Sequence, residues 1–287
     1  MLKVGLIQIT SSDQPADNLQ TISQMIREAH AQGAQLIVTP EVTNCVSADR
    51  KHQSQVLTLQ ENDVSLQSYR DLAAELNVWL MIGSLALKSG DPDGRFVNRC
   101  FLISSNGSIA AQYDKIHMFD VALSETETYQ ESKGYRPGDT AAIAACDFGT
   151  VGLSICYDLR FPHLFRDLAQ AGTQIITVPS AFATISGEAH WHVLLRARAI
   201  ETGCFVIAPA QTGKHAATVG KQSETYGHCL VVCPWGEVLL DAGTATGVSI
   251  IEIDLETVET ARRRIPSLQH DRKYKAPKCQ TPPQKTP

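Results

Sequence analysis

A short apolar run in the second half of the chain ends at a cysteine and is followed by a proline. The run 151–155 leads into Cys156, and Pro162 comes shortly after it. Apolar runs of this length read as buried strands, and a proline with its fixed φ suits the first turn of a helix. The pattern therefore predicts a strand that delivers Cys156 to the edge of a sheet, directly before a helix. Such strand-to-helix steps are typical of α/β folds.

The predicted position of Cys156 suggests a reactive thiol. Backbone N–H groups at a helix N-terminus favour a negative charge, so we expect this position to favour the thiolate, which is the reactive form of cysteine. The alternative is that Cys156 fills the core, which is the commoner role of a lone cysteine on an apolar strand.

Two other predicted strands end at charged residues. The β-branched run 36–39 stops at Pro40, which cannot donate to a sheet ladder, so Glu41 is expected at the strand's carboxyl end. A predicted hairpin closed by Asn106-Gly107 runs on to Lys115. Ligands of open α/β sheets bind at the carboxyl ends of strands. The sequence thus predicts one site that combines a carboxylate, an ammonium group and a thiol.

The rest of the chain alternates helical and strand patterns. Helices are predicted over 18–31, 64–76, 162–171 and 189–202, and strands over 4–9, 79–87, 175–178, 205–208, 229–233, 238–241 and 249–253. Strands joined both by helices and by hairpins imply mixed sheets. No linker or repeat interrupts the chain before Asp271. We therefore expect a single domain over residues 1–271 and a Pro- and Lys-rich C-terminal tail over 272–287.

Composition fits a soluble enzyme. The chain has 287 residues, of which 43% are hydrophobic, and this is enough for a large core. A formal net charge of -5 argues against nucleic-acid binding. The sequence contains neither a signal-peptide pattern nor an apolar run long enough for membrane insertion. Eight scattered cysteines fit the reducing cytoplasm.

Three segments resemble the signature segments of the nitrilase superfamily of carbon–nitrogen hydrolases. They are Pro40-Glu41, Tyr113-Asp114-Lys115-Ile116-His117 and Ile155-Cys156-Tyr157-Asp158-Leu159-Arg160-Phe161-Pro162, and they occur in the expected order. The resemblance implies a nitrilase-like, four-layer αββα sandwich, in which helices lie outside two packed mixed sheets. It also implies a catalytic triad of Glu41, Lys115 and Cys156.

Further segments are similar to the branch of this superfamily that contains deaminated glutathione amidase and omega-amidase. They are Pro179-Ser180-Ala181-Phe182, residues 189–201, Tyr226-Gly227-His228 and Pro234-Trp235-Gly236. The run 195–201 is nearer the former enzyme. The resemblance implies a small-molecule amide substrate that carries a carboxylate, either deaminated glutathione or, as the alternative, 2-oxoglutaramate.

The three residues suit amide hydrolysis. Cys156 would attack the carbonyl and form a thioester, while Glu41 would take the thiol proton and later activate water. Lys115 and the backbone N–H of Tyr157 would stabilise the oxyanion. This chemistry requires no metal and no organic cofactor.

Two further residues are candidates for the site. Glu131 matches the second glutamate of the superfamily, which orients the lysine, although by sequence alone it could be a surface carboxylate. Arg160 could hold a substrate carboxylate through its guanidinium fork. The alternative for Arg160 is a structural ion pair with Asp158 or Asp167.

Several other interpretations remain open. His190 and His192 would point to different faces of a helix, so a shared metal ion is not expected. A Cys-His hydrolase could use His163 or His228 as its base. A non-catalytic oligomeric interaction protein could also keep this fold. The segment 212–225 is expected to form a rim loop that affects specificity.

Self-association is the final expectation. In the superfamily, the helix after Cys156 and the helix over 189–202 form a dimer face, so a homodimer or larger homo-oligomer is implied. The apolar positions expected at this face are Leu164, Leu168, Val193, Leu194 and Ala197.

Overall fold

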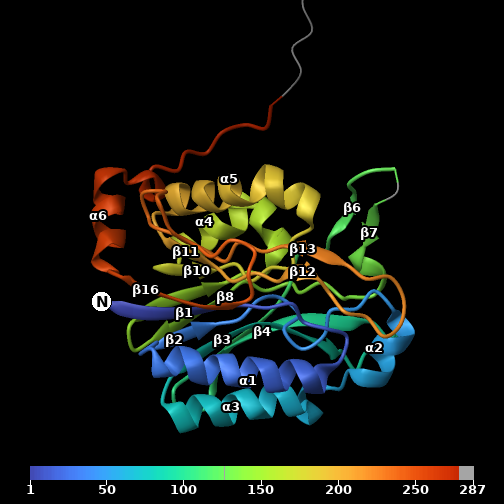
Figure 1. The fold of residues 1–287 in the computed structure, drawn as a ribbon. Coiled ribbons are helices and arrows are strands. Elements are labelled where there is room, and N and C mark those ends of the chain that lie inside the picture. The colour runs from blue at the N-terminus through green and yellow to red at the C-terminus, as the bar shows by residue number, and fades with distance from the viewer. Residues whose placement is uncertain (126, 278–287) are drawn as a thin grey trace, which may run out of the picture.

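The chain folds into four layers. The computed structural model describes residues 1–125 and 127–277. Two six-stranded sheets lie face to face, and helices cover the outer face of each sheet (Figure 1). The predicted αββα sandwich is therefore confirmed. Of the predicted C-terminal tail, residues 278–287 lie outside the described residues.

The first sheet has the strand order β16-β1-β2-β3-β4-β5. Its three central strands β1, β2 and β3 are parallel, whereas β16, β4 and β5 join antiparallel, so the sheet is mixed as predicted. In chain order these strands are β1 (Leu2–Gln8), β2 (Leu36–Val38), β3 (Trp79–Lys88), β4 (Phe96–Ile103), β5 (Ile109–Asp114) and β16 (Gly247–Ile253).

The second sheet repeats this plan with the strand order β15-β14-β11-β10-β9-β8. Here β9, β10 and β11 are parallel, and β8, β14 and β15 are antiparallel to their neighbours. The strands are β8 (Ala142–Cys146), β9 (Gly149–Leu153), β10 (Ile175–Thr177), β11 (Phe205–Ala208), β14 (Leu230–Val232) and β15 (Val238–Asp241).

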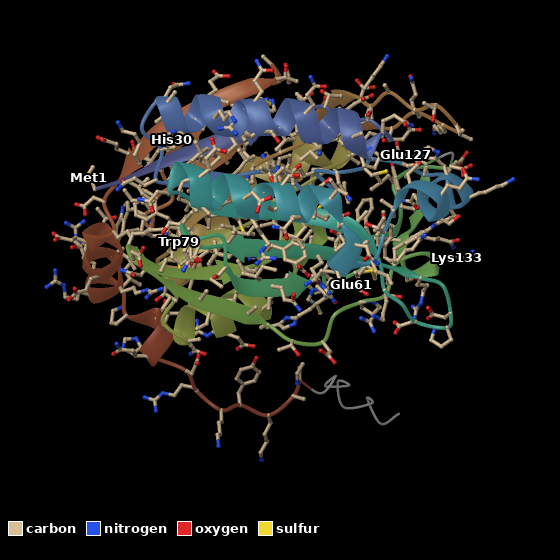
Figure 2. All side chains as sticks on the ribbon, turned by 90° about the horizontal axis from the view of Figure 1, so that it is seen from below. Met1, His30, Glu61, Trp79, Glu127 and Lys133 are labelled. Atoms are coloured by element: carbon tan, nitrogen blue, oxygen red, sulfur yellow. The ribbon has the colours of Figure 1, made fainter. Side chains whose placement is uncertain are left out.

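Two helices cover each sheet. Helices α1 (Pro15–Ala31) and α3 (Val64–Leu76) lie side by side over the first sheet (Figure 2). Helices α4 (Pro162–Gln170) and α5 (Thr184–Thr202) cover the second sheet. Smaller elements are α2 (Arg50–Val56), α6 (Glu256–Arg264) and two ribbons, formed by β6 (Asp120–Ala122) with β7 (Thr128–Gln130) and by β12 (Thr212–Lys214) with β13 (Glu224–Tyr226).

Two helices start earlier than predicted. Helix α1 begins at Pro15 rather than at Asn18, because the proline itself occupies the first turn. Helix α5 begins at Thr184 rather than at Ala189. Gly187 disfavours a helix by propensity, yet a Cβ there would lie 2.3 Å from the Tyr226 ring, so only glycine lets this turn pack against β13.

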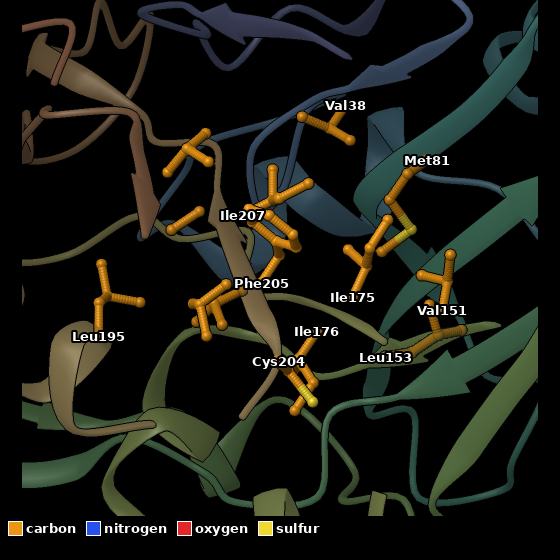
Figure 3. Packing of buried hydrophobic residues seen from close by; sticks show 14 of the residues in the cluster. Val38, Met81, Val151, Leu153, Ile175, Ile176, Leu195, Cys204, Phe205 and Ile207 are labelled. Carbon is orange, nitrogen blue, oxygen red and sulfur yellow. The ribbon is translucent and has the colours of Figure 1, made fainter. Parts of the chain in front are cut away.

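The largest core lies between the two sheets. Val38 and Met81 of the first sheet share one cluster with Val151, Leu153 and Ile175 of the second (Figure 3). A separate cluster fills the space between the first sheet and its helices. Strands buried on both faces read as continuous apolar runs, and this explains the runs that end at Pro40 and Cys156.

Polar contacts hold the segment around Asp271 against α4. Arg166 and Gln170 of α4 both hydrogen-bond to the Asp271 carboxylate, near the boundary expected from the sequence. Among the helices of the described ranges, none is both long and apolar enough to cross a membrane.

Candidate active site

Glu41 lies in a tight turn after β2. Its side chain is buried, and the turn is closed by a hydrogen bond from Thr43 Oγ1 to the Pro40 carbonyl at 2.6 Å. Strand β3 passes so close that a Cβ on Gly83 would lie 1.9 Å from the Thr39 carbonyl oxygen. Only glycine permits this approach, and the turn is therefore locked against β3. Glu41 follows the carboxyl end of its strand, as predicted.

Lys115 follows β5 and meets Glu41 in the interior. Its side chain is buried, and Nζ donates to Glu41 Oε1 at 2.9 Å. The same ammonium group contacts both oxygens of Glu131, at 2.9 and 3.1 Å. One cation thus lies between two carboxylates.

Glu131 is part of this cluster. It begins a single 3-10 turn after β7, and its Oε2 also accepts the Phe119 backbone N–H at 2.6 Å. Its side chain is only 14% exposed. The interpretation of Glu131 as an ordinary surface carboxylate is therefore wrong.

Cys156 lies just beyond β9, at the start of a 3-10 helix (Cys156–Arg160), and α4 begins at Pro162 as predicted. The cysteine has a left-handed backbone, with φ of 50°. Its N–H donates to the Pro179 carbonyl at 3.0 Å. A non-glycine residue in this region is strained, and such strain is found preferentially at functional sites.

The expectation that this position favours the thiolate is wrong. Burial and the neighbouring Glu41 carboxylate raise the pKa of the Cys156 thiol well above its ordinary value, and Lys115 only partly offsets this. The single 3-10 turn at Cys156 also presents fewer aligned N–H groups than an α-helix would. The thiol form of Cys156 is therefore favoured over the thiolate, and a nucleophilic role for it would require a base.

Glu41 is placed to be that base. Burial alone would raise the pKa of Glu41, but Lys115 and hydrogen bonds from the Cys156 thiol and the Ala181 N–H lower it overall. Burial would lower the pKa of Lys115, but Glu131 and Glu41 raise it well above its ordinary value. One cavity therefore brings together a carboxylate, an ammonium group and a thiol whose ionisation is disfavoured.

A cavity of about 260 Å³ opens onto these groups. Glu41, Lys115, Glu131 and Cys156 all line it. Five aromatic residues contribute to its walls, namely Phe119, Tyr129, Tyr135, Tyr157 and Phe182. Residues 223–225, from the segment expected to form a rim loop, also line it. The cavity suits a small-molecule substrate.

Asn98, which was not predicted from the sequence, also lines the cavity. Its side chain lies on β4 and donates from Nδ2 to Glu41 Oε1 at 2.8 Å. The available signal was a neutral amide in a strand whose other residues, apart from Arg99, are apolar.

Arg160 does not line the cavity, but its guanidinium packs on the cavity's walls. The group lies 5.8 Å from the ring centroid of Tyr157 and 5.4 Å from that of Phe182. Its polar contact is with His190 Nδ1, at 3.3 Å from Nη2. The alternative ion pair with Asp158 or Asp167 is not formed among residues 1–125 and 127–277.

The histidines divide between different partners. His190 contacts Arg160, whereas His192 contacts Asp241. His192 instead lies near His228, and the two rings hydrogen-bond to the two oxygens of Asp241, at 2.9 and 2.8 Å. The nitrogen and oxygen atoms of these three side chains that could bind a metal lie within 4.8 Å of one another. The hydrogen bonds explain this closeness, because they join α5 to β15 through Asp241.

A histidine base for Cys156 is not supported by this geometry. Neither His163 nor His228 lines the cavity that holds Cys156. The side chain that hydrogen-bonds to the thiol belongs to Glu41.

Comparison with known proteins agrees with the geometry. The chain is 38% identical over 273 residues to "Deaminated glutathione amidase" of Yersinia enterocolitica, covering 94% of this chain and 92% of that protein. It is also 38% identical to the human protein of that name, covering 94% of this chain and 82% of that protein.

Solved structures show the same fold. The Caenorhabditis elegans NitFhit protein superposes with a TM-score of 0.86 at 34% identity, covering 94% of this chain and 65% of that one. Saccharomyces cerevisiae Nit3, described as a member of branch 10 of the nitrilase superfamily, gives a TM-score of 0.81 at 27% identity, covering 94% and 96%. The family model of carbon-nitrogen hydrolases matches residues 3–263, and this chain therefore belongs to the carbon-nitrogen hydrolase family.

Proposed function

We propose that this chain is an amidase that hydrolyses deaminated glutathione to 2-oxoglutarate and cysteinylglycine. The observation that carries the proposal is that Glu41, hydrogen-bonded to the Lys115 ammonium, lines the same small cavity as the Cys156 thiol. The substrate follows from the relatives that are 38% identical and carry the name deaminated glutathione amidase.

The first half of the reaction forms a thioester. Cys156 Sγ attacks the amide carbonyl as its proton passes to Glu41, and the carbonyl oxygen becomes an oxyanion. Lys115 and the Tyr157 N–H stabilise that charge, and one such donor is commonly worth roughly 10²–10³ in rate. The C–N bond then breaks, and the departing amine takes the proton from Glu41.

The second half releases the acid. Glu41, again a carboxylate, removes a proton from water, and the resulting hydroxide attacks the thioester carbonyl. The C–S bond breaks, the sulfur recovers its proton from Glu41, and the carboxylic acid leaves. Glu131 supports both halves, because its two contacts with Lys115 hold the ammonium group in place.

Arg160 is the proposed partner for the oxoacid carboxylate. It has the required fork of donors and stacks against Tyr157 and Phe182, both of which line the cavity. No carboxylate of the described chain competes for it in an ion pair.

The experiment is a comparison of kcat/KM for deaminated glutathione and for 2-oxoglutaramate, with release of the amine or ammonia as the readout. The proposal predicts a higher value for deaminated glutathione. A preference for 2-oxoglutaramate would instead make the enzyme an omega-amidase. Inactivity on both would contradict the proposed substrate class.

The same samples test the nucleophile. Protein quenched during turnover should carry an acyl group on Cys156 by peptide mass spectrometry, and Cys156→Ala should carry none and have no activity. Failure to trap any acyl-enzyme in an inactive wild-type protein would favour a non-catalytic interaction protein.

We also propose that the protein self-associates in the cytoplasm. Ile200, Trp235 and Ile265 lie around one surface hollow, and Val193 precedes Ile200 by two turns of α5. All four are exposed, by 55%, 55%, 59% and 67% respectively. Of the positions expected at the dimer face, Leu164 and Leu168 are instead buried in the core of the single chain. The seven cysteines of the described ranges are free thiols, and this supports a reducing compartment.

A further inference from the structure

Asn98 lies on the strand between the segments that carry Glu41 and Lys115. Strand β4 is paired with β3 on one side and β5 on the other, and β5 runs into Lys115. The Asn98 backbone carbonyl accepts the Lys115 N–H at 2.9 Å, while its side-chain Nδ2 donates to Glu41 Oε1 at 2.8 Å. Asn98 thus contacts two members of the site at once.

The two oxygens of Glu41 have different partners. Oε1 accepts from Asn98 Nδ2 and from Lys115 Nζ, at 2.8 and 2.9 Å. Oε2 accepts from the Ala181 backbone N–H at 2.8 Å. Two donors therefore occupy Oε1, and Oε2 is the oxygen with room for a proton.

The side-chain amide of Asn98 includes one polar atom that destabilises the fold. Its Oδ1 is buried and has no hydrogen-bond partner among the described residues. An orphaned buried acceptor is destabilising, and an apolar side chain of the same shape would avoid that penalty. Natural proteins violate such rules chiefly at functional sites.

We propose that Asn98 is a positioning residue that fixes the catalytic proton on Oε2 of Glu41. This inference rests on the proposed function. When the S–H bond of Cys156 breaks, the new O–H bond forms at Oε2, and Oε1 becomes the carbonyl oxygen of the neutral acid. A carbonyl oxygen still accepts from both Asn98 and Lys115, so neither donor has to move during the transfer.

A neutral donor suits this place better than a second cation. Lys115 already lies between Glu41 and Glu131. A further positive charge at residue 98 would stabilise the carboxylate of Glu41 and weaken it as a base. The primary amide orients the carboxylate without adding charge.

The test uses Asn98→Leu, which keeps the shape and removes the donor, with Asn98→Ala as a second variant. Iodoacetamide alkylation of Cys156 is followed by peptide mass spectrometry across the pH range, because this readout needs no substrate. Loss of the Asn98 donor should slow alkylation of Cys156 on the order of tenfold or more. It should also shift the acid limb of the pH–rate profile, where the rate falls as Glu41 becomes protonated, to higher pH. With an amide substrate, kcat should fall and KM should change little, since Asn98 acts through Glu41.

Asn18→Ala is the matched control. Asn18 is also a buried asparagine, and within the described ranges its side chain hydrogen-bonds to backbone and hydroxyl groups of residues 12 and 44. This variant should lower Tm and leave the alkylation profile unchanged, whereas Asn98→Leu should keep or raise Tm.

A wild-type alkylation profile in both Asn98 variants would overturn the inference. So would a fall in Tm without any change in the acid limb, because that is the signature of a structural role. If the profile shifts as expected while the wild-type protein hydrolyses no amide, the positioning role stands and the proposed substrate class fails.

Discussion

Asp158 Oδ1 accepts hydrogen bonds from the backbone N–H and the ring Nδ1 of His117, at 3.0 and 2.7 Å. Its other oxygen accepts from the Tyr113 hydroxyl at 2.7 Å and from the Ile155 N–H at 2.9 Å. Asp158 is fully buried. Two signature segments that are far apart in the sequence are thus joined by one carboxylate, which sets the position of Lys115 relative to Cys156.

We expect Asp158→Asn to destabilise the protein by about 3 kcal/mol, because an amide nitrogen cannot replace an oxygen that accepts two of these bonds. Urea unfolding measures the change. Asp167→Asn, on the exposed side of α4, is the control and should stay within about 0.5 kcal/mol of wild type. Equal stabilities of the two variants would contradict the structural role of Asp158.

The backbone at Cys156 gives a second prediction. Its φ of 50° is strained for any residue with a Cβ, so Cys156→Gly should be more stable than Cys156→Ala by about 1 kcal/mol. Both variants should be inactive. Comparing these two separates strain from the loss of the thiol, and an alanine variant as stable as the glycine variant would show that the turn is unstrained.

The contacts of the triad were less predictable than its residues. Strand ends marked by Pro40 and by the run before Cys156 could be found from the sequence, because buried strands and their breakers leave local patterns. The raised pKa of the Cys156 thiol could not, since it depends on burial and on Glu41, which follows a strand of the other sheet. Asp158 and Asn98 act through contacts across strands, and such contacts leave no local pattern. The αββα layering itself came from resemblance to a family.

The way in which the free energy of unfolding changes at acid pH should depend on Glu41. Its pKa is lowered in the folded protein from an ordinary value of 4.5, mainly because Lys115 overcomes the effect of burial. The carboxylate therefore stabilises the fold above pH 4.5, and this contribution is lost as the pH falls through the lower folded pKa. The free energy of unfolding, measured by urea at several pH values, should fall less steeply below pH 4.5 in Glu41→Gln than in wild type. If the free energy of unfolding fell equally steeply with pH in both proteins, the proposed link between Glu41 ionisation and stability would be contradicted.

Self-association should depend on the exposed face of α5. Val193 and Ile200 lie two turns apart on one stripe beside Trp235, and an isologous dimer would bury them by symmetry. Light scattering should give about twice the chain mass of 31.3 kDa for wild type and a monomer for Val193→Asp. Ile185→Asp is the control, because Ile185 is also an exposed apolar residue but lies near the start of α5. This variant should remain associated. A wild-type monomer at micromolar concentration would contradict the proposal.

Substrate recognition by Arg160 can be separated from catalysis by comparing two amides. For a substrate with an oxoacid carboxylate, Arg160→Gln should lower kcat/KM by roughly tenfold to a hundredfold, because a charge-assisted bidentate contact is lost. For a neutral amide of similar size the variant should match wild type, since Arg160 lies outside the contacts that join Glu41, Lys115 and Cys156. Arg160→Lys tests geometry, because a point charge should restore only part of the affinity. An equal loss on both amides would mean that Arg160 supports the walls formed by Tyr157 and Phe182 rather than the substrate, and the carboxylate would then have to bind elsewhere at the cavity mouth.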